Sequence, residues 1–105
     1  MKEADLVREI ANYLTLRKAW YWRQNVGTLV GASGRPVRFG QKGTPDFYAR
    51  SRPRRGESPA RVVWIEAKTE DGRQTKEQKE FERRAIAHGD VYILARCIED
   101  VMEVL

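Results

Sequence analysis

The stretch VVWIEAK, from Val62 to Lys68, has the composition of a buried β-strand, yet it finishes in a carboxylate and an ammonium. Valine, isoleucine and tryptophan favour the pleated surface of a sheet. Residues two apart in a strand point to the same face, so Glu66 and Lys68 share a face with Trp64 and lie about 6 to 7 Å apart. We therefore expect a strand that delivers an acid and a lysine to one end of a sheet.

The Glu-x-Lys pattern is weak evidence when it stands alone. A second copy, Glu77 to Lys79, falls inside a predicted helix, where residues two apart point in nearly opposite directions. That copy should be a solvated surface pair. The first copy differs because Asp46, in GTPDF, starts the strand predicted just before it. If the two strands pair, Asp46 and Glu66 meet at the same end of the sheet.

The rest of the chain alternates between helical and extended periods. An amphipathic helix is predicted from Glu3 to about Lys18, and a second helix starts at a capping box on Thr75 and stops at Gly89. The other predicted elements are strands over 19–26, 45–50, 60–68 and 90–96, a short extended piece at 37–39 and a helix over 98–105. The middle two strands are most simply an antiparallel hairpin, and the apolar strand 90–96 suggests burial on both faces.

This order, α-β-β-β-α-β-α, predicts an α/β fold with a mixed central sheet flanked by helices, in a single domain over 1–105. The 105 residues are 41% hydrophobic and 33% charged, which excludes fibrous and membrane classes. No apolar run is long enough to cross a bilayer, and the N-terminus is unlike a secretory signal, so we expect a cytoplasmic protein of a bacterial or phage-infected host cell. The single cysteine, Cys97, is expected to be a buried or half-buried hydrophobe.

Positive charge is concentrated in one segment. The net charge is +5, and Arg50 to Arg61 contains five arginines and one glutamate. This segment is either an arm that contacts phosphates or a solvated loop kept soluble by its charge. The glycine-rich segment 31–43 lacks the ending of a phosphate-binding loop, so no nucleotide cofactor is expected. The basic residues expected to contact DNA phosphates are Arg35, Arg38, Lys42, Arg52, Arg54 and Arg55.

Two adjacent carboxylates and a lysine suggest a specific chemistry. Carboxylates as close as Asp46 and Glu66 repel each other unless a cation neutralises them. Oxygen ligands with room for water suit Mg²⁺ or Mn²⁺, which take one or two carboxylates together with substrate phosphate oxygens. Lys68 could hold the attacking water and stabilise charge on the phosphate. The residues therefore indicate a site that cleaves phosphodiester bonds.

The combination of GTPD, nineteen residues, EAK and then a helix with TKEQKEF resembles the virus-type replication-repair nuclease domain (VRR-NUC), a branch of the PD-(D/E)XK nuclease superfamily. The resemblance covers nearly the whole chain and includes an early glutamate that matches Glu3 and the segment WRQNVG. It implies a restriction-endonuclease-like core that cuts DNA with a divalent metal. It also implies a homodimer similar to the enzymes that resolve four-way DNA junctions.

The resemblance also implies roles for single residues. Asp46 and Glu66 would bind the metal, and the backbone carbonyl of Ala67 would complete the protein ligands. Lys68 would be the catalytic lysine. Glu3 would reach the metal through water. Gln78 would point from its helix back to the site.

Several of these residues have simpler explanations. An acid such as Glu3 in a first helical turn is favoured by the helix dipole, and Glu9 on the same helix is a rival. Gln78 is explained equally well by the capping box. His88, the only histidine, is interpreted as a helix cap rather than a general base. The aromatics of 20–22 fit the core or a dimer interface better than stacking on unpaired bases.

The sequence thus predicts a Mg²⁺- or Mn²⁺-dependent DNA endonuclease of replication, recombination or repair, selective for DNA structure, with branched DNA as a candidate substrate. The alternative is a non-catalytic nucleic-acid-binding module with the same fold. The two carboxylates favour the enzyme, because a binding module gains nothing from acids aimed at a polyanion.

Overall fold

The structure is a computed structural model that describes residues 1–24, 27–30, 32–39, 41–52 and 60–105, with the backbone alone for 27–30 and 36–39. Its elements in chain order are α1 (Glu3–Leu16), β1 (Trp20–Arg23), β2 (Gly27–Val30), β3 (Pro36–Phe39), β4 (Phe47–Arg50), β5 (Val62–Ala67), α2 (Lys76–Ala87), β6 (Val91–Ala95) and α3 (Ile98–Met102). Among the described helices, none is long and apolar enough to cross a membrane.

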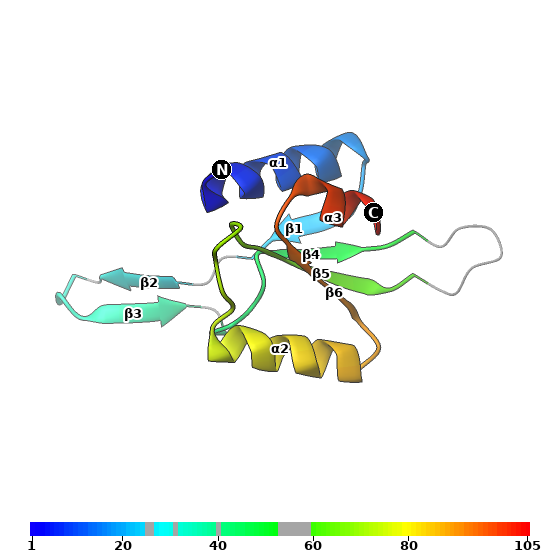
Figure 1. Cartoon of the computed structure of the whole chain (residues 1–105). Helices are drawn as coiled ribbons and strands as arrows, with labels where there is room; N and C mark the ends of the chain where they lie inside the picture. The colour runs from blue at the N-terminus through cyan, green and yellow to red at the C-terminus, as the bar shows by residue number, and fades with distance from the viewer. Residues whose placement is uncertain (25–26, 31, 40, 53–59) are drawn as a thin grey trace.

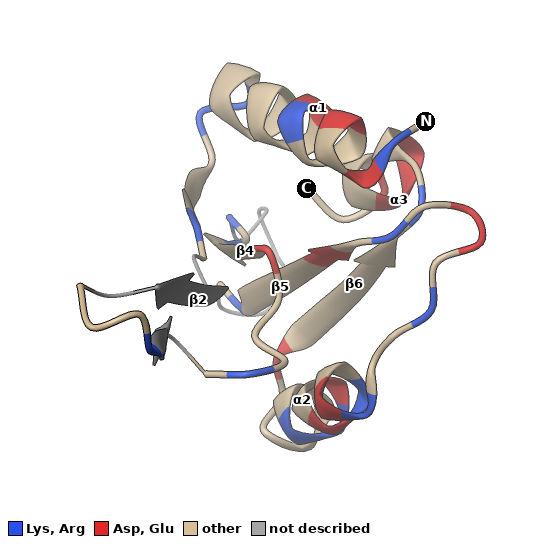
Figure 2. Ribbon diagram, turned by 90° about the vertical axis from the view of Figure 1, so that its left-hand side faces the viewer, with Lys and Arg blue, Asp and Glu red and all other residues tan. Residues whose placement is uncertain are grey.

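A four-stranded sheet in the order β1-β4-β5-β6 forms the centre of the molecule (Figure 1). β1 pairs antiparallel with β4, and β4 pairs antiparallel with β5, which confirms the predicted hairpin. β5 and β6 are parallel and are connected through α2. α1 and α3 lie on one side of the sheet and α2 lies on the other (Figures 1 and 2). The prediction of a mixed sheet flanked by helices is therefore confirmed.

The core lies between the sheet and α1. Leu6, Ile10 and Leu14 recur at helical spacing along α1, and all three are buried in one cluster with Phe47 of β4 and Ile65 of β5. Burying one such side chain contributes about 1.5–3 kcal/mol. This packing fixes β4 and β5 relative to the first turn of α1, and so positions the residues at the ends of these three elements.

α2 starts and packs as its sequence predicts. The Thr75 hydroxyl accepts the N–H of Gln78 at 3.1 Å, and the Gln78 side-chain oxygen accepts the N–H of Thr75 at 2.8 Å, so the capping box is present. Phe81 meets Trp64 of β5 edge to face, with ring centroids 4.8 Å apart. α2 therefore packs on β5 through this contact and also packs on the neighbouring edge strand β6.

The end of α2 also follows its sequence. His88 is the C-cap residue, and its Nδ1 lies 2.8 Å from the carbonyl oxygen of Arg84. Gly89 follows with φ +86°, a left-handed conformation that glycine adopts without strain. The interpretation of His88 as a helix cap is confirmed.

The stretch between β1 and β4 differs from the prediction. It forms two strands, β2 and β3, which pair antiparallel and make a separate two-stranded sheet instead of one short extended piece. This hairpin extends away from the central sheet (Figure 1). Its turn contains Gly34 with φ +77°. The predicted element order was therefore short by two strands, because glycines at both ends of the stretch had indicated a loop.

Three local expectations were also wrong. The strand 90–96 is not buried on both faces, because β6 is an edge strand: Ile93 and Ala95 are buried, whereas Leu94 is only half-buried. The last helix, predicted over 98–105, ends at Met102, and Met102 is exposed. Cys97 is exposed because it precedes α3 as its N-cap residue.

Candidate active site

The residues singled out in the sequence meet at the end of the central sheet where β4 begins and β5 ends. The register pairs Phe47 with Ile65, so Asp46, just before β4, lies beside Glu66 near the end of β5. Figure 2 shows β5 between the side covered by α1 and the side covered by α2. The predicted meeting of Asp46 and Glu66 is therefore present in the structure.

Asp46 is held from two sides. Its Oδ2 accepts the backbone N–H of Ala67 at 2.8 Å, which ties the start of β4 to the end of β5. Its Oδ1 forms an ion pair with Nη1 of Arg23 at 3.1 Å, and the same Nη1 donates to the Asp46 carbonyl oxygen at 2.9 Å. A charge-assisted bond of this kind fixes the carboxylate in one orientation.

Glu66 is the one buried charged residue of the described core, at 4% exposure. Its Oε1 accepts Nε2 of Gln78 at 2.8 Å and lies 3.7 Å from Nζ of Lys68. Its Oε2 is buried without a hydrogen-bond partner among the described residues. A buried oxygen of this kind costs free energy unless something else pairs with it.

The surroundings of Glu66 shift its protonation. Burial raises the pKa of Glu66 from its usual 4.5 to about 7, and the neighbouring charge of Asp46 adds to this. The ammonium of Lys68 acts in the opposite direction, whereas the charge of Glu3 raises the pKa further. Near neutral pH, the carboxyl group therefore exchanges readily between its neutral and charged forms.

Lys68 lies between two acids. Its side chain is 12% exposed, and its Nζ lies 3.7 Å from Oε1 of Glu66 and 4.0 Å from Oε1 of Glu3. Glu3 is in the first turn of α1, where the helix dipole also favours an acid. Glu3 therefore combines the structural role with a place beside the site.

Gln78 likewise does both of the things expected of it. Its oxygen closes the capping box of α2, and its Nε2 donates to Glu66. The helix is brought close by Gly43, which has φ +90° and leaves room for the carbonyl of Glu77: a Cβ at position 43 would lie 2.5 Å from that oxygen. The GTPD segment therefore packs closely against the first turn of α2. This contact places Gln78 where its side chain reaches Glu66.

Arg23 is a site residue that the sequence analysis missed. It belongs to β1, which pairs with β4 so that Arg23 lies opposite Phe47, next to Asp46. The signal in the sequence was its place inside the predicted strand 19–26 and in the segment WRQNVG of the resemblance. That signal becomes informative only when the pairing of β1 with β4 is known.

The predicted phosphate-contacting residues whose side chains the structure describes have different surroundings. Lys42 forms an ion pair with Glu77 at 3.2 Å. Arg52 donates to the carbonyl oxygen of Lys18 at 2.9 Å, and Arg35 is exposed in the turn of the β2–β3 hairpin. The side chain of Arg38 and the residues Arg54 and Arg55 lie outside what the structure describes.

The site offers oxygen ligands for a cation, but fewer acids than expected. Within the described part of the chain, no three acidic, histidine or cysteine side chains lie close enough together to hold a metal ion. Glu3 is turned to Lys68 instead. The remaining set is Asp46, Glu66 and the Ala67 carbonyl. The buried, unpartnered Oε2 of Glu66 beside a second carboxylate fits a divalent cation that keeps several water ligands.

We compared the chain with models of protein families, with curated proteins and with solved structures, and no match was found in any of the three comparisons.

Proposed function

We propose that the chain is a metal-dependent DNA endonuclease that hydrolyses phosphodiester bonds and prefers branched DNA, as its resemblance to the VRR-NUC nucleases implies. The observation that supports this most is the buried carboxylate of Glu66, with one unpartnered oxygen, beside Asp46. Burying a charge next to a like charge is costly. Such an arrangement is reasonable where a cation and its phosphate ligand complete the site.

Asp46 and Glu66 would hold Mg²⁺ or Mn²⁺ together with the carbonyl oxygen of Ala67. When bound, such an ion supplies positive charge to the phosphate oxygens and lowers the pKa of its bound water. Arg23 fixes Asp46 by an ion pair at 3.1 Å, and Gln78 fixes Glu66 by a hydrogen bond at 2.8 Å. Both residues act by positioning, because they hold ligands and do not themselves reach the reacting atoms.

Lys68 is the residue proposed to act on the reacting groups. Its ammonium has three donors, and Glu66 and Glu3 hold it at the edge of the carboxylate pair. From there it can donate to a water aimed at phosphorus and to the phosphate oxygen on which negative charge develops. In the reaction, the water oxygen forms a bond to phosphorus and gives up one proton, the ester P–O bond breaks, and the leaving oxygen takes up one proton, so that one water is added across the ester bond.

Cleavage of labelled DNA by the purified protein tests the proposal. Four-way junctions, splayed duplexes, linear duplexes and single strands are incubated with Mg²⁺, Mn²⁺ or EDTA. We expect cleavage with either metal and none with EDTA. Asp46→Asn, Glu66→Gln and Lys68→Ala should each lower the rate at least about 100-fold.

The chain supplies its own control. Lys79→Ala alters the second Glu-x-Lys copy, whose lysine is exposed on α2, and should leave the rate unchanged. Cleavage that persists in EDTA or in Asp46→Asn would contradict the mechanism. If the protein binds all four substrates without cutting any of them, it is the non-catalytic binding module instead.

A further inference from the structure

Two tryptophans of β1 lie exposed on one side of the sheet. Trp20 and Trp22 are two residues apart, so they share a face, and they are 67% and 44% exposed. Tyr21 between them points the other way, packs against the core and lies 6.1 Å from the ring of Phe47. The core therefore accounts for one of the three aromatics and leaves two large apolar rings in solvent.

The exposed rings are backed by a row of aromatic side chains. Trp22 stacks on Tyr48 of β4 with centroids 4.0 Å apart and an interplanar angle of 20°, and Tyr48 meets the edge of Trp64 at 5.1 Å. The row is then covered by Phe81 of α2. The ring of Trp22 is held by this packing, so little conformational freedom remains to be lost when a flat ligand stacks on it.

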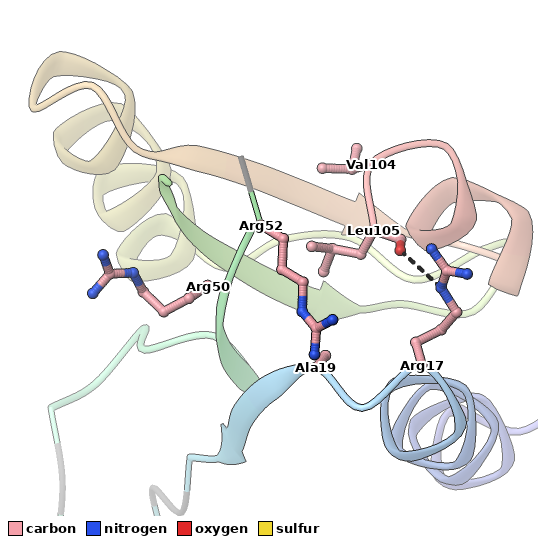
Figure 3. A pocket seen from close by; sticks show the side chains of 6 residues that line it. All are labelled: Arg17, Ala19, Arg50, Arg52, Val104 and Leu105. Carbon is pink, nitrogen blue, oxygen red and sulfur yellow. Dashed lines mark hydrogen bonds between the residues drawn. The ribbon is translucent and has the colours of Figure 1, made fainter. Parts of the chain in front are cut away.

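Arg50 borders the same surface. The guanidinium carbon of Arg50 lies 5.8 Å from the centroid of the Trp20 ring, and its Nε is buried without a partner among the described residues. Beside it is a pocket of about 290 Å³ lined by Arg17, Ala19, Arg50, Arg52, Val104 and Leu105 (Figure 3). In this view Arg50 extends away from Arg17, whose guanidinium points toward the Leu105 carbonyl oxygen. The pocket is therefore not drawn as a closed cage of three guanidiniums around one anion.

We propose that Trp20 and Trp22, with Arg50 and Arg52, bind a single-stranded segment of nucleic acid, whose bases stack on the indole rings and whose phosphates contact the guanidiniums. Alternating flat apolar groups and cations match the alternating bases and phosphates of a single strand. A protein partner with an apolar face would instead cover Arg50, whose Nε is already buried without a partner among the described residues. The surface is called the β1 platform below.

The position of the β1 platform deepens the proposed function, on which this inference rests. β1 runs from Trp20 to Arg23, which contacts Asp46, so Trp22 lies about 3 Å and Trp20 about 10 Å along the strand from Arg23 at the candidate active site. Trp22, Tyr48 and Trp64 are in register across the sheet, and Glu66 follows Trp64 on the same face. Unpaired bases bound to the β1 platform would belong to the same strand whose phosphate enters the candidate active site. The protein would therefore prefer DNA with a single-stranded branch.

Binding measured without cleavage tests the inference. A short fluorescently labelled oligothymidylate and a duplex of equal length are titrated with the full chain in EDTA, and anisotropy is recorded. Trp20→Ala and Trp22→Ala should each weaken binding of the oligothymidylate about 5- to 150-fold, and Trp22→Phe should restore most of it, because stacking is lost and regained. Ile86→Ala and Arg8→Ala, exposed residues on α2 and α1, are the matched controls and should change nothing.

A second measurement uses the unaltered protein and covers the case in which a variant fails to fold. Photocrosslinking to an oligonucleotide that carries 5-bromouracil, followed by trypsin digestion, should label the peptide 19–23, which contains both platform tryptophans, and not the peptide 62–68, which contains Trp64. Label confined to other peptides, or equal affinity of wild type and both alanine variants, would overturn the inference. A change in oligomeric state in Trp22→Ala without a change in binding would assign the surface to a second copy.

The outcomes separate the two proposals. Loss of cleavage in Asp46→Asn with full binding of oligothymidylate supports the active site and leaves the platform unaffected. Loss of oligothymidylate binding in Trp20→Ala supports the platform even if no metal-dependent cleavage is found. Failure of the wild type to bind the single strand overturns the platform, whatever its action on duplex DNA.

Discussion

At the residue scale, Glu66 combines properties that a surface glutamate does not have. It is 4% exposed, one of its oxygens has no partner among the described residues, and a second carboxylate lies beside it. Residues held at a cost to stability are characteristic of functional sites. The strand period in VVWIEAK was sufficient to place this carboxylate beside Lys68. Its burial was not predictable, because it depends on how α2 covers the end of β5.

Glu66 should make the stability of the metal-free protein depend on pH. An acid with a higher pKa in the folded chain binds its proton more tightly when folded, so its contribution to stability is full below about pH 4.5 and is lost as the pH rises through about 7. The loss amounts to about 3 kcal/mol. Denaturant unfolding of the wild type in EDTA should therefore show a smaller contribution of Glu66 to the free energy of unfolding at pH 8 than at pH 5.

Glu66→Gln provides the comparison for this prediction. The amide carries no charge, so the contribution of this position should no longer change between pH 5 and pH 8, and at pH 8 the metal-free variant should be more stable than the wild type. Equal pH dependence in both proteins would show that Glu66 is not the group that titrates.

Gln78 both closes the capping box of α2 and donates a hydrogen bond to the Glu66 carboxylate, and substitutions can separate these two roles. Thr75→Ala removes the cap and should cost about 1 kcal/mol of stability while cleavage is kept. Gln78→Ala removes the side-chain half of the capping box, which accepts the N–H of Thr75, together with the bond to Glu66, so cleavage should also fall about 10- to 100-fold. Cleavage is measured below the unfolding temperatures of both variants. Equal rates would show that Gln78 acts only in the helix cap and that its bond to Glu66 does not affect cleavage.

At the scale of elements, the sequence predicted the helices and strands that are marked by local sequence patterns such as caps and turns. The capping box on Thr75 and the stop at Gly89 placed α2 to within a residue or two, and the turn signals between β4 and β5 predicted their hairpin. The pairing of β1 with β4 was not predictable, since no local signal states which strand occupies a sheet edge. Arg23 was missed for that reason. The β2–β3 hairpin was missed because its glycines outweighed its few strand residues.

The close approach of the GTPD segment to α2 gives a prediction at this scale. Gly43→Ala places a Cβ about 2.5 Å from the Glu77 carbonyl oxygen at φ +90°, so it should destabilise the fold by about 2–4 kcal/mol, in addition to moving Gln78. Gly89→Ala is the matched control, with φ +86° and open space around it, and should cost about 1–2 kcal/mol. Thermal unfolding of both variants measures the difference. Equal losses would mean that the contact with Glu77 is unimportant.

At the scale of the whole molecule, the two ends of the sheet differ in chemistry. Asp46 and Glu66 lie at one end, and Arg50 and Arg52 lie toward the other, where Arg50 ends β4. The sequence indicated both kinds of residue but not their separation, because it does not state at which end of the sheet Arg50 and Arg52 lie. The net charge of +5 favours a polyanionic partner, and the acids occupy the place where that partner would need a cation.

Binding of Mn²⁺ tests most directly whether Asp46 and Glu66 form one divalent-cation site. Calorimetric titration of the purified chain at pH 8, where Glu66 is deprotonated, should show saturable binding that Asp46→Asn and Glu66→Gln each weaken at least about 10-fold and that Glu99→Gln, an exposed acid of α3, leaves unchanged. Binding should also weaken from pH 8 to pH 5.5 in the wild type. Mn²⁺ affinity that is the same in the wild type, Asp46→Asn and Glu66→Gln would contradict the account.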